Sequence, residues 1–259
     1  MTVAVSVVVT TLGISASDVL EGKGGSLLGQ LIGTDVSICP PGMTHVESAL
    51  TFTCVDTFEA SPTPACVYSN PASGVETAAN REDIDCMSVS QTGATPWRFV
   101  TRDDAQLFCT RSGKRLPTAF EWYQAAIGTP SSRCNISSNV LFPAGKQSSC
   151  LSATGIFDAA GNVWEWTSDD VIEGVYKERK LPNSGYVTQV DAGGVATESI
   201  QEVSETSFDN DYIWSNQIGS FGIIRGGFYA SGNDGGVYAV QATTKSSFFS
   251  SALGFRCVR

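Results

Sequence analysis

The eight cysteines are the feature that most constrains how this chain can fold. They stand at positions 39, 54, 66, 86, 109, 134, 150 and 257 and include no Cys-x-x-Cys pair. Because His45 is the only histidine in 259 residues, we expect no zinc site of the usual Cys/His kind. An even number of cysteines favours disulfides, in an oxidising or extracellular setting or in a thermophilic archaeal cytosol. Eight thiols allow on the order of a hundred pairings, so the sequence alone does not select one.

Charge limits the classes of partner. With 16 Lys and Arg against 26 Asp and Glu, the formal charge of -10 repels phosphate backbones and anionic membrane surfaces. We therefore expect no nucleic-acid ligand and no insertion into a membrane. A hydrophobic content of 42% with 16% charged residues is ordinary for a globular protein, and the length suffices for a substantial core.

Residues 1–38 are predicted to stand apart from the domain at 39–259. The alternation of valines from Val3 to Val9 suits a strand, and five glycines at 21–38 suit a connector. The N-terminal apolar run is about twelve residues long and has no Lys or Arg before Lys23. It therefore fits neither a signal peptide nor a transmembrane helix.

The next part of the chain indicates a mixed α+β domain. Residues 39–58 predict a strand, a turn and a strand, and the polar stretch 61–91 predicts a loop tethered by disulfides. Two helices should follow. Thr101 with Asp104, and Thr118 with Glu121, have the spacing of capping boxes, and a glycine ends each pattern, at 113 and 128.

The block GIFDAAGNVWEWTSDD, residues 155–170, predicts a strand on which Trp164 and Trp166 share a face as core anchors. Two carboxylates in this block, Asp158 and Glu165, would need a cation or hydrogen-bond donors if they are buried. Calcium, a salt bridge and backbone hydrogen bonds are all open. Residues 171–217 predict an insertion over the domain surface with strands near 186–190 and 212–214, and residues 253–258 predict a closing strand.

No catalytic residue is expected. Any Ser/His/Asp or Cys/His arrangement would depend on His45, which lies where a turn leads into a strand and is expected to have a surface or structural role. The glycines near Lys23 lack the Lys-Ser/Thr ending of a phosphate-binding loop. Adjacent acidic pairs, such as Asp103 with Asp104, diverge on a helix and are expected to be solvated.

The C-terminal segment, residues 225–259, has the composition of a contact surface. Glycines punctuate its ends, and its middle is crowded with Phe, Tyr, Ser, Thr and Asn. Aromatic side chains supply large contact area at little cost in entropy, while the small polar residues supply adaptable hydrogen bonding. The same mixture also occurs in plain solvent-facing loops.

Four ordered blocks, GKRLPTAFEWYQAA, GIFDAAGNVWEWTSDD, IIRGGFYASG and ALGFRCVR, resemble the formylglycine-generating-enzyme (sulfatase-modifying factor) family over roughly residues 39–259. The resemblance implies an α+β, C-type-lectin-like fold with two helices and long loops. It also implies a disulfide between Cys109 and Cys257. The calcium ligands of that family match Asp158, Gly161, Val163 and Glu165, which implies a structural calcium ion.

One departure from that family bears on function. Formylglycine-generating enzymes carry a copper-binding catalytic cysteine pair between the RGG and GFR motifs. Here no cysteine lies between Arg225 and Cys257. We therefore expect neither copper nor an enzyme.

The same segment is similar to the variable region of diversity-generating retroelement proteins, which use this lectin-like fold. The resemblance implies a fixed framework and an exchangeable set of ligand-binding side chains. The framework positions are Arg225, Gly226, Gly227, Gly232, Gly236, Val237, Ala239, Gly254, Phe255 and Arg256. The ligand-binding positions are Phe228, Tyr229, Ala230, Ser231, Asn233, Asp234, Tyr238, Gln241, Thr243, Thr244, Phe248, Phe249, Ser250 and Ala252.

This resemblance implies a ligand-binding protein of a virus or prokaryote that recognises a protein or cell-surface partner. It would act at a cell surface, on a virion or in the extracellular space. Two alternatives stay open. One is an oxidase of the formylglycine-generating type with a relocated site, and the other is a calcium-dependent sugar lectin, although the sugar-selecting EPN and QPD tripeptides are absent.

Overall fold

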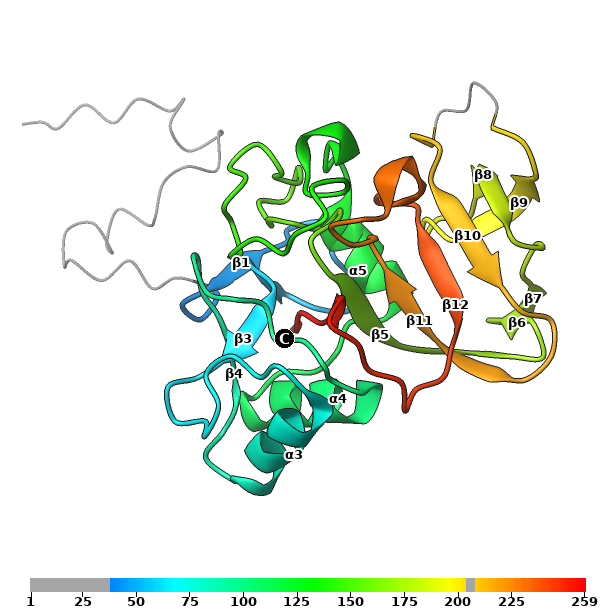
Figure 1. Cartoon of the computed structure of the whole chain (residues 1–259). Coiled ribbons are helices and arrows are strands. Elements are labelled where there is room, and N and C mark those ends of the chain that lie inside the picture. The colour runs from blue at the N-terminus through cyan, green and yellow to red at the C-terminus, as the bar shows by residue number, and fades with distance from the viewer. Residues whose placement is uncertain (1–37, 204–207) are drawn as a thin grey trace, which may run out of the picture. The chain divides into compact units, whose positions relative to one another are not determined.

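A nine-stranded sheet organises the part of the chain that the structure describes (Figure 1). The structure is a computed structural model that describes residues 38–203 and 208–259. The predicted N-terminal strand and the predicted connector up to residue 37 lie outside these residues. The strand order is β7-β6-β5-β11-β12-β10-β8-β9, with β13 beside β5. The central strands are β5 (Trp164–Ile172), β11 (Ser220–Arg225), β12 (Val240–Thr244) and β10 (Tyr212–Ser215).

Residues 171–217 complete this sheet. They form β6 (Val175–Tyr176), β7 (Arg179–Lys180), β8 (Gly185–Val190), β9 (Ala196–Ile200) and β10. The two strands expected here are confirmed. The expectation that the stretch lies over the surface of a finished domain is wrong, because Val187, Val195 and Ile213 are buried in one core cluster with Val240 of β12.

The two expected helices begin at the expected capping boxes. In α4 (Arg102–Arg111) the Thr101 hydroxyl accepts from the Asp104 N–H at 3.1 Å, and the Asp104 carboxylate accepts from the Thr101 N–H at 3.1 Å. Thr118 and Glu121 make the same pair of bonds at the start of α5 (Ala119–Ala126). Each box satisfies two backbone donors that a helix start leaves free, so both helices have fixed first residues.

A third helix, α3 (Gly74–Glu82), lies inside the segment expected to be a loop. The expected number of two helices is therefore wrong for the described residues. Only Thr77 and Asn80 of α3 are buried, so the helix has no apolar period for the sequence to reveal. Its start is fixed by Ser73, whose hydroxyl accepts from the Glu76 N–H at 3.3 Å.

Two short antiparallel pairs lie outside the large sheet. In one, β1 (Met43–His45) pairs with β2 (Cys54–Asp56), the strand-turn-strand expected near residues 39–58. In the other, β3 (Ala60–Pro62) pairs with β4 (Ser88–Ser90). The expected closing strand is shorter than 253–258, because only β13 (Leu253–Gly254) pairs with β5.

All eight cysteines form disulfides: Cys39–Cys54, Cys66–Cys86, Cys109–Cys257 and Cys134–Cys150. The third joins α4 to the chain just after β13 and is the pairing that the family resemblance implies. The second tethers the segment that contains α3. The other three pairings could not be read from the sequence and are decided by the fold.

Two core clusters divide the faces of the sheet. Trp166, Ile224 and Leu253 lie in the cluster that includes Phe108 of α4, whereas Ile223, Val240 and Ile213 lie in the cluster that includes Ala119 of α5. Trp164 and Trp166 are both buried, as expected of core anchors. The partly exposed side chains Gln241 and Thr243 alternate along β12 with Val240 and Ala242, which are buried. The face of β12 opposite the α5 cluster is therefore open to solvent.

Candidate binding surface

The C-terminal segment leaves and rejoins the sheet twice. After β11 the chain turns at Gly226 and Gly227, forms the 3-10 helix η2 (Gly232–Asp234), and returns as β12. It then runs through residues 245–252 to β13. We call residues 226–239 the first display loop and residues 245–252 the second display loop.

The expected framework and the expected ligand-binding set separate by burial. Every framework position except Gly232 is buried, and Arg225, Phe255 and Arg256 are fully enclosed. By contrast, none of the ligand-binding positions is buried. Framework and ligand-binding side chains are thus interspersed within one short segment, and the fold buries the first kind and leaves the second kind at least partly exposed.

Close backbone packing explains the glycines at the start of the first display loop. Gly226 has φ +94°, and a Cβ there would lie 2.7 Å from the Ala159 carbonyl oxygen. Gly227 has φ +86°, and its Cβ would lie 2.7 Å from the Gly235 Cα. An L side chain at either position would be strained and would clash, so the turn requires glycine.

Backbone hydrogen bonds fix the first display loop. The Tyr229 N–H donates to the Asn162 carbonyl at 3.0 Å, and the Tyr229 carbonyl accepts from the Asn139 N–H at 2.9 Å. The Gly232 N–H donates to the Ile136 carbonyl at 2.7 Å. None of these bonds uses a side chain, so the residues of this loop can be exchanged without loss of these anchors.

The second display loop is fixed in the same way. Its carbonyls at Ser246, Ser250 and Ala252 accept from the N–H groups of Arg102, Phe99 and Trp164, at 3.0, 2.9 and 2.9 Å. Between these anchors the rings of Phe248 and Phe249 are 51% and 46% exposed. Large apolar rings are thus held in water on a fixed backbone, which is the chemistry of a binding surface.

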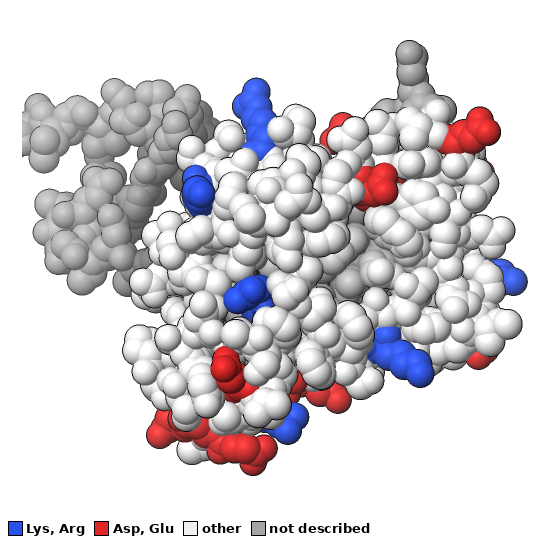
Figure 2. Space-filling view, in the orientation of Figure 1, with Lys and Arg blue, Asp and Glu red and all other residues white. Residues whose placement is uncertain are grey.

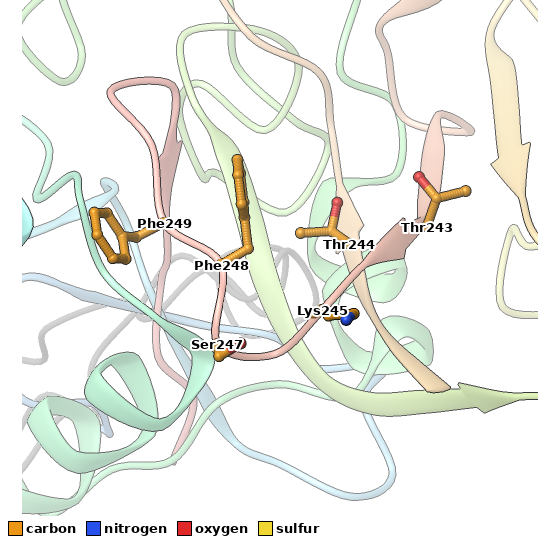
Figure 3. A pocket seen from close by; sticks show the side chains of 6 residues that line it. All are labelled: Thr243, Thr244, Lys245, Ser247, Phe248 and Phe249. Carbon is orange, nitrogen blue, oxygen red and sulfur yellow. The ribbon is translucent and has the colours of Figure 1, made fainter. Parts of the chain in front are cut away.

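A groove of about 550 Å³ lies at this loop. Figure 3 shows Phe248 and Phe249 on one side of it and Thr243 and Thr244 of β12 on the other. Lys245 and Ser247 complete the lining. The lining of this groove therefore combines two aromatic residues, three hydroxyl-bearing residues and one lysine.

The expected ligand-binding set contains five aromatic residues, and two of them are partly engaged in packing. Phe228 packs against the core cluster on the α4 side of the sheet. Tyr238 has ring contacts with Tyr123 and Phe208, at 5.8 and 4.9 Å between centroids. The most freely presented apolar rings are therefore Phe248 and Phe249.

Sequence reasoning missed a row of aromatic side chains beside this surface. Tyr186 of β8, Tyr212 and Trp214 of β10, and Trp164 of β5 contact one another in sequence, with ring centroids 5.1, 4.7 and 5.6 Å apart. Trp214 pairs in register with Gln241 of β12, so the row continues the ligand-binding set across the sheet. Its signal was the alternation in Tyr212, Ile213 and Trp214, but only the strand order brings it to β12.

Charge is sparse over these strands. Figure 2 shows few charged side chains over β11, β12 and β10, and acidic side chains concentrated at the margins of the view. Among the ligand-binding positions only Asp234 has a carboxyl group, and its partial burial raises its pKa. The surface therefore consists mainly of apolar and uncharged polar side chains, although the chain as a whole is strongly acidic.

The residues implied as calcium ligands have other partners. Both carboxylate oxygens of Glu165 accept from the Arg256 guanidinium at 2.6 Å, and one also accepts from the Trp122 indole N–H at 2.6 Å. The Asp158 carboxylate accepts from the Gly145 N–H at 2.6 Å. Gly161 lies against the Asn135 carbonyl, and the Val163 N–H donates to the Glu59 carboxylate.

This donor set does not fit calcium as it is arranged, because a guanidinium already occupies both oxygens of Glu165 and would repel a divalent cation. Within residues 38–203 and 208–259, no cluster of three or more His, Cys, Asp or Glu side chains is placed to hold a metal ion. The family resemblance implies a calcium ion here, whereas the present contacts lead us to expect none at these four residues.

Burial perturbs the charged groups around this ion pair. Desolvation raises the pKa of Asp158 to about 6, and it raises the pKa of Glu59 well above its usual value with help from the nearby carboxylates of Asp158 and Glu165. Burial opposes the charge on Arg256, but the Glu165 carboxylate more than offsets it and raises the pKa of Arg256. The Glu165–Arg256 ion pair thus influences the pKa values of both neighbouring buried carboxyl groups.

Neither the histidine nor the cysteines supply a free catalytic group within the display loops. His45 is exposed at the end of β1, as expected. Every cysteine in the chain is in a disulfide, so no free thiol is present. Among the described helices, none has the length and apolar character needed to span a bilayer.

Comparison with known families gives one match that covers most of the chain. The sequence matches the profile of the Sulfatase-modifying factor enzyme 1-like domain over residues 51–151 and 131–259. The formylglycine-generating enzyme of Mus musculus is 30% identical over 100 residues, which is 29% of this chain and 27% of the mouse protein. The Bos taurus enzyme is 29% identical over 100 residues, with the same coverage. The match therefore spans only 27% of the length of either enzyme.

Solved structures with a related arrangement have low identity. The Major Tropism Determinant I1 Variant superposes with a TM-score of 0.49 at 16% identity, over 86% of this chain and 53% of that chain. Treponema denticola variable protein 1 superposes with a TM-score of 0.39 at 16% identity, over 63% of this chain and 70% of that chain.

Proposed function

The chain belongs to the Sulfatase-modifying factor enzyme 1-like domain family, and from that premise we propose that it is a ligand-binding member and not an enzyme. Its C-terminal segment would display exchangeable side chains, diversified by a retroelement, for recognition of a protein or cell-surface partner. Action at a cell surface, on a virion or outside the cell is part of the proposal.

The observation that carries this proposal is the separation by burial within residues 225–259. The framework side chains are enclosed, whereas the ligand-binding side chains are exposed or half-exposed on loops held by main-chain bonds. Such a division lets a surface change its chemistry while the fold is kept, because the exchanged atoms contribute little to the core.

The absence of a free thiol supports the exclusion of the family's oxidase chemistry. Formylglycine-generating enzymes, in the resemblance given above, use a cysteine pair between the RGG and GFR motifs. Here that stretch has no cysteine, and every cysteine elsewhere is paired in a disulfide. A relocated thiol site would need one of the four disulfides to be open.

The test is selection of ligands from a random peptide display library. The wild-type chain should enrich defined sequences, and a variant with Tyr229→Ala, Phe248→Ala and Phe249→Ala should bind them at least tenfold more weakly, since exposed aromatic anchors carry much of the binding energy. A matched control removes three exposed apolar side chains elsewhere, Leu50→Ala, Ile84→Ala and Ile218→Ala, and should keep the affinity.

Two results would contradict the proposal. One is equal binding by the triple variant and the control. The other is oxygen consumption by the wild-type chain, supplied with copper and a cysteine-containing peptide, because that would place the chain among the oxidases. In the genome, a neighbouring reverse transcriptase and a near-copy of the segment that differs at adenines would support the diversification.

A further inference from the structure

Arg98 lies beside the display surface but outside the segment that is expected to vary. Its carbonyl accepts from the Thr77 hydroxyl of α3 at 3.4 Å, and its guanidinium donates to the Asn70 side chain at 3.2 Å. The Tyr229 hydroxyl is near enough to interact with its charge. This arginine therefore lies beside α3 and within electrostatic range of Tyr229 in the first display loop.

The residue after Arg98 ties it to the second display loop. Phe99 donates its N–H to the Ser250 carbonyl at 2.9 Å, and its ring lies 5.6 Å from the Arg98 guanidinium carbon. Phe99 has φ +58°, a conformation that a bulky residue adopts only when its surroundings enforce it. The neighbouring ring of Phe249 lies against Gly74 at the start of α3, where a Cβ would come within 2.7 Å of it. The guanidinium thus lies against the Phe99 ring, and both α3 and the second display loop bond to the backbone of residues 98 and 99.

Arg98 has no carboxylate partner among the residues that the structure describes. Other arginines there have one, such as Arg102 with Asp170, Arg115 with Glu121 and Arg256 with Glu165. The Nε of Arg98 is buried and has no hydrogen-bond partner, and burial lowers the pKa of the group. The buried Nε is out of reach of a partner molecule, but a half-buried cation without a carboxylate partner is costly to the free protein, and an anion at the exposed part of the guanidinium would relieve that cost.

The surroundings favour one kind of anion. The Phe99 ring lies against the Arg98 guanidinium, and the loop that Phe99 binds through Ser250 carries the groove lined by Lys245, Phe248 and Phe249. Arginine among exposed aromatic side chains is the composition of protein-binding hot spots. The guanidinium fork matches a carboxylate through two parallel hydrogen bonds, and the groove accepts an apolar side chain. The chain carries a net charge of -10, so Arg98 and Lys245 are local cations on an acidic protein.

We propose that Arg98 is a fixed anion-recognition residue of the display surface. The partner segment it takes is an acidic stretch of polypeptide, with an Asp or Glu carboxylate on the guanidinium and an adjacent apolar side chain in the groove. This inference rests on the proposed function. In this proposal Arg98 makes a charge contact that stays constant, and the ligand-binding residues of 225–259 make aromatic and polar contacts that vary.

The experiment uses the peptides that the full-length wild-type chain enriches from the random display library. We expect an Asp or Glu next to a bulky apolar residue in the enriched sequences. Changing that acid to Asn or Gln should weaken binding to wild type about tenfold, the effect of a charge-assisted hydrogen bond of about 1.4 kcal/mol. The same peptide change should have no effect on binding to an Arg98→Gln variant. An Arg133→Gln variant, which changes an exposed arginine, should behave as wild type.

Each outcome has a distinct meaning. If enriched peptides lack acids, or if their acids matter equally to the wild type and to Arg98→Gln, the Arg98 inference is overturned while the proposed binding function stands. If no peptide is enriched at all, both fail. If heparin binds in a way that depends on Arg98 and the acidic peptides do not, the partner is a sulfated polysaccharide and the choice of polypeptide is wrong. An Arg98→Lys variant should recover only part of the affinity, because it keeps the charge but loses the fork.

Discussion

Arg256 and Phe248 belong to the same C-terminal segment and have opposite surroundings. Arg256 is fully enclosed, and its side chain donates to the Glu165 carboxylate and to the carbonyls of Asp56 and Phe157. Phe248 is half-exposed, and its main-chain N–H is the group that is bonded, to the Lys245 carbonyl. The Arg256 side chain thus stabilises the backbone around it, whereas the backbone bond at Phe248 does not depend on its side chain. Only a position of the second kind can be substituted while the fold is kept.

The largest effect should come from Arg256→Met. Removing the guanidinium leaves the Glu165 carboxylate buried without its cation, with Glu59 and Asp158 nearby, and breaking such a pair costs about 3–5 kcal/mol. Urea denaturation would measure the loss. Arg133→Met, at an exposed arginine, should change the free energy of unfolding by less than about 0.5 kcal/mol. Equal free energies of unfolding for the two variants would contradict the distinction between framework positions and exposed positions.

A matched pair of phenylalanines sharpens the same comparison. Phe255→Ala should cost about 3–5 kcal/mol because its ring is fully buried in the core cluster beside Trp97. Phe248→Ala should change the free energy of unfolding by no more than about 0.5 kcal/mol, since half of its ring already contacts water. Chemical denaturation of both variants checks this. A large loss of stability on removal of Phe248 would mean that its ring is structural.

The capping box of α5 predicts a pH dependence of the framework. Burial works against the charge on Glu121, but the hydrogen bonds from Arg115, Thr51 and the Thr118 N–H prevail and lower its pKa to about 2. A carboxyl whose pKa is lowered by folding contributes stability above its unfolded pKa and loses it as pH falls toward 2. With allowance for solvent screening, the contribution is about 1–2 kcal/mol. Between pH 5 and pH 2, the midpoint temperature of thermal unfolding should fall less steeply for a Glu121→Gln variant than for the wild type.

Calcium should have the smallest effect. The Glu165 carboxylate already has Arg256 as its cation, so adding calcium or a chelator should leave the thermal midpoint unchanged. A rise in the midpoint that saturates with calcium concentration would show that the arrangement opens to admit the ion. Magnesium at the same concentration is the control for ionic strength.

Local patterns in the sequence were enough for several parts of the fold. The capping boxes at Thr101 and Thr118 depend on residues three positions apart, and β8 and β10 follow from local β-forming composition. The α+β, C-type-lectin-like fold of the formylglycine-generating-enzyme type came from the ordered motifs and is confirmed by the family match. The helix α3 escaped because its buried face is made of Thr77 and Asn80.

What the sequence by itself supplied was the division of residues 225–259 into an expected framework and an expected ligand-binding set, because the motifs that carry the family resemblance are short and local. Only the tertiary structure decided where those side chains meet. The parallel pairing of β10 with β12 brings Trp214 beside Gln241, and the bond from Phe99 to Ser250 brings Arg98 to the display loops. These contacts join residues far apart in the chain, and a one-dimensional pattern carries no information about such distances.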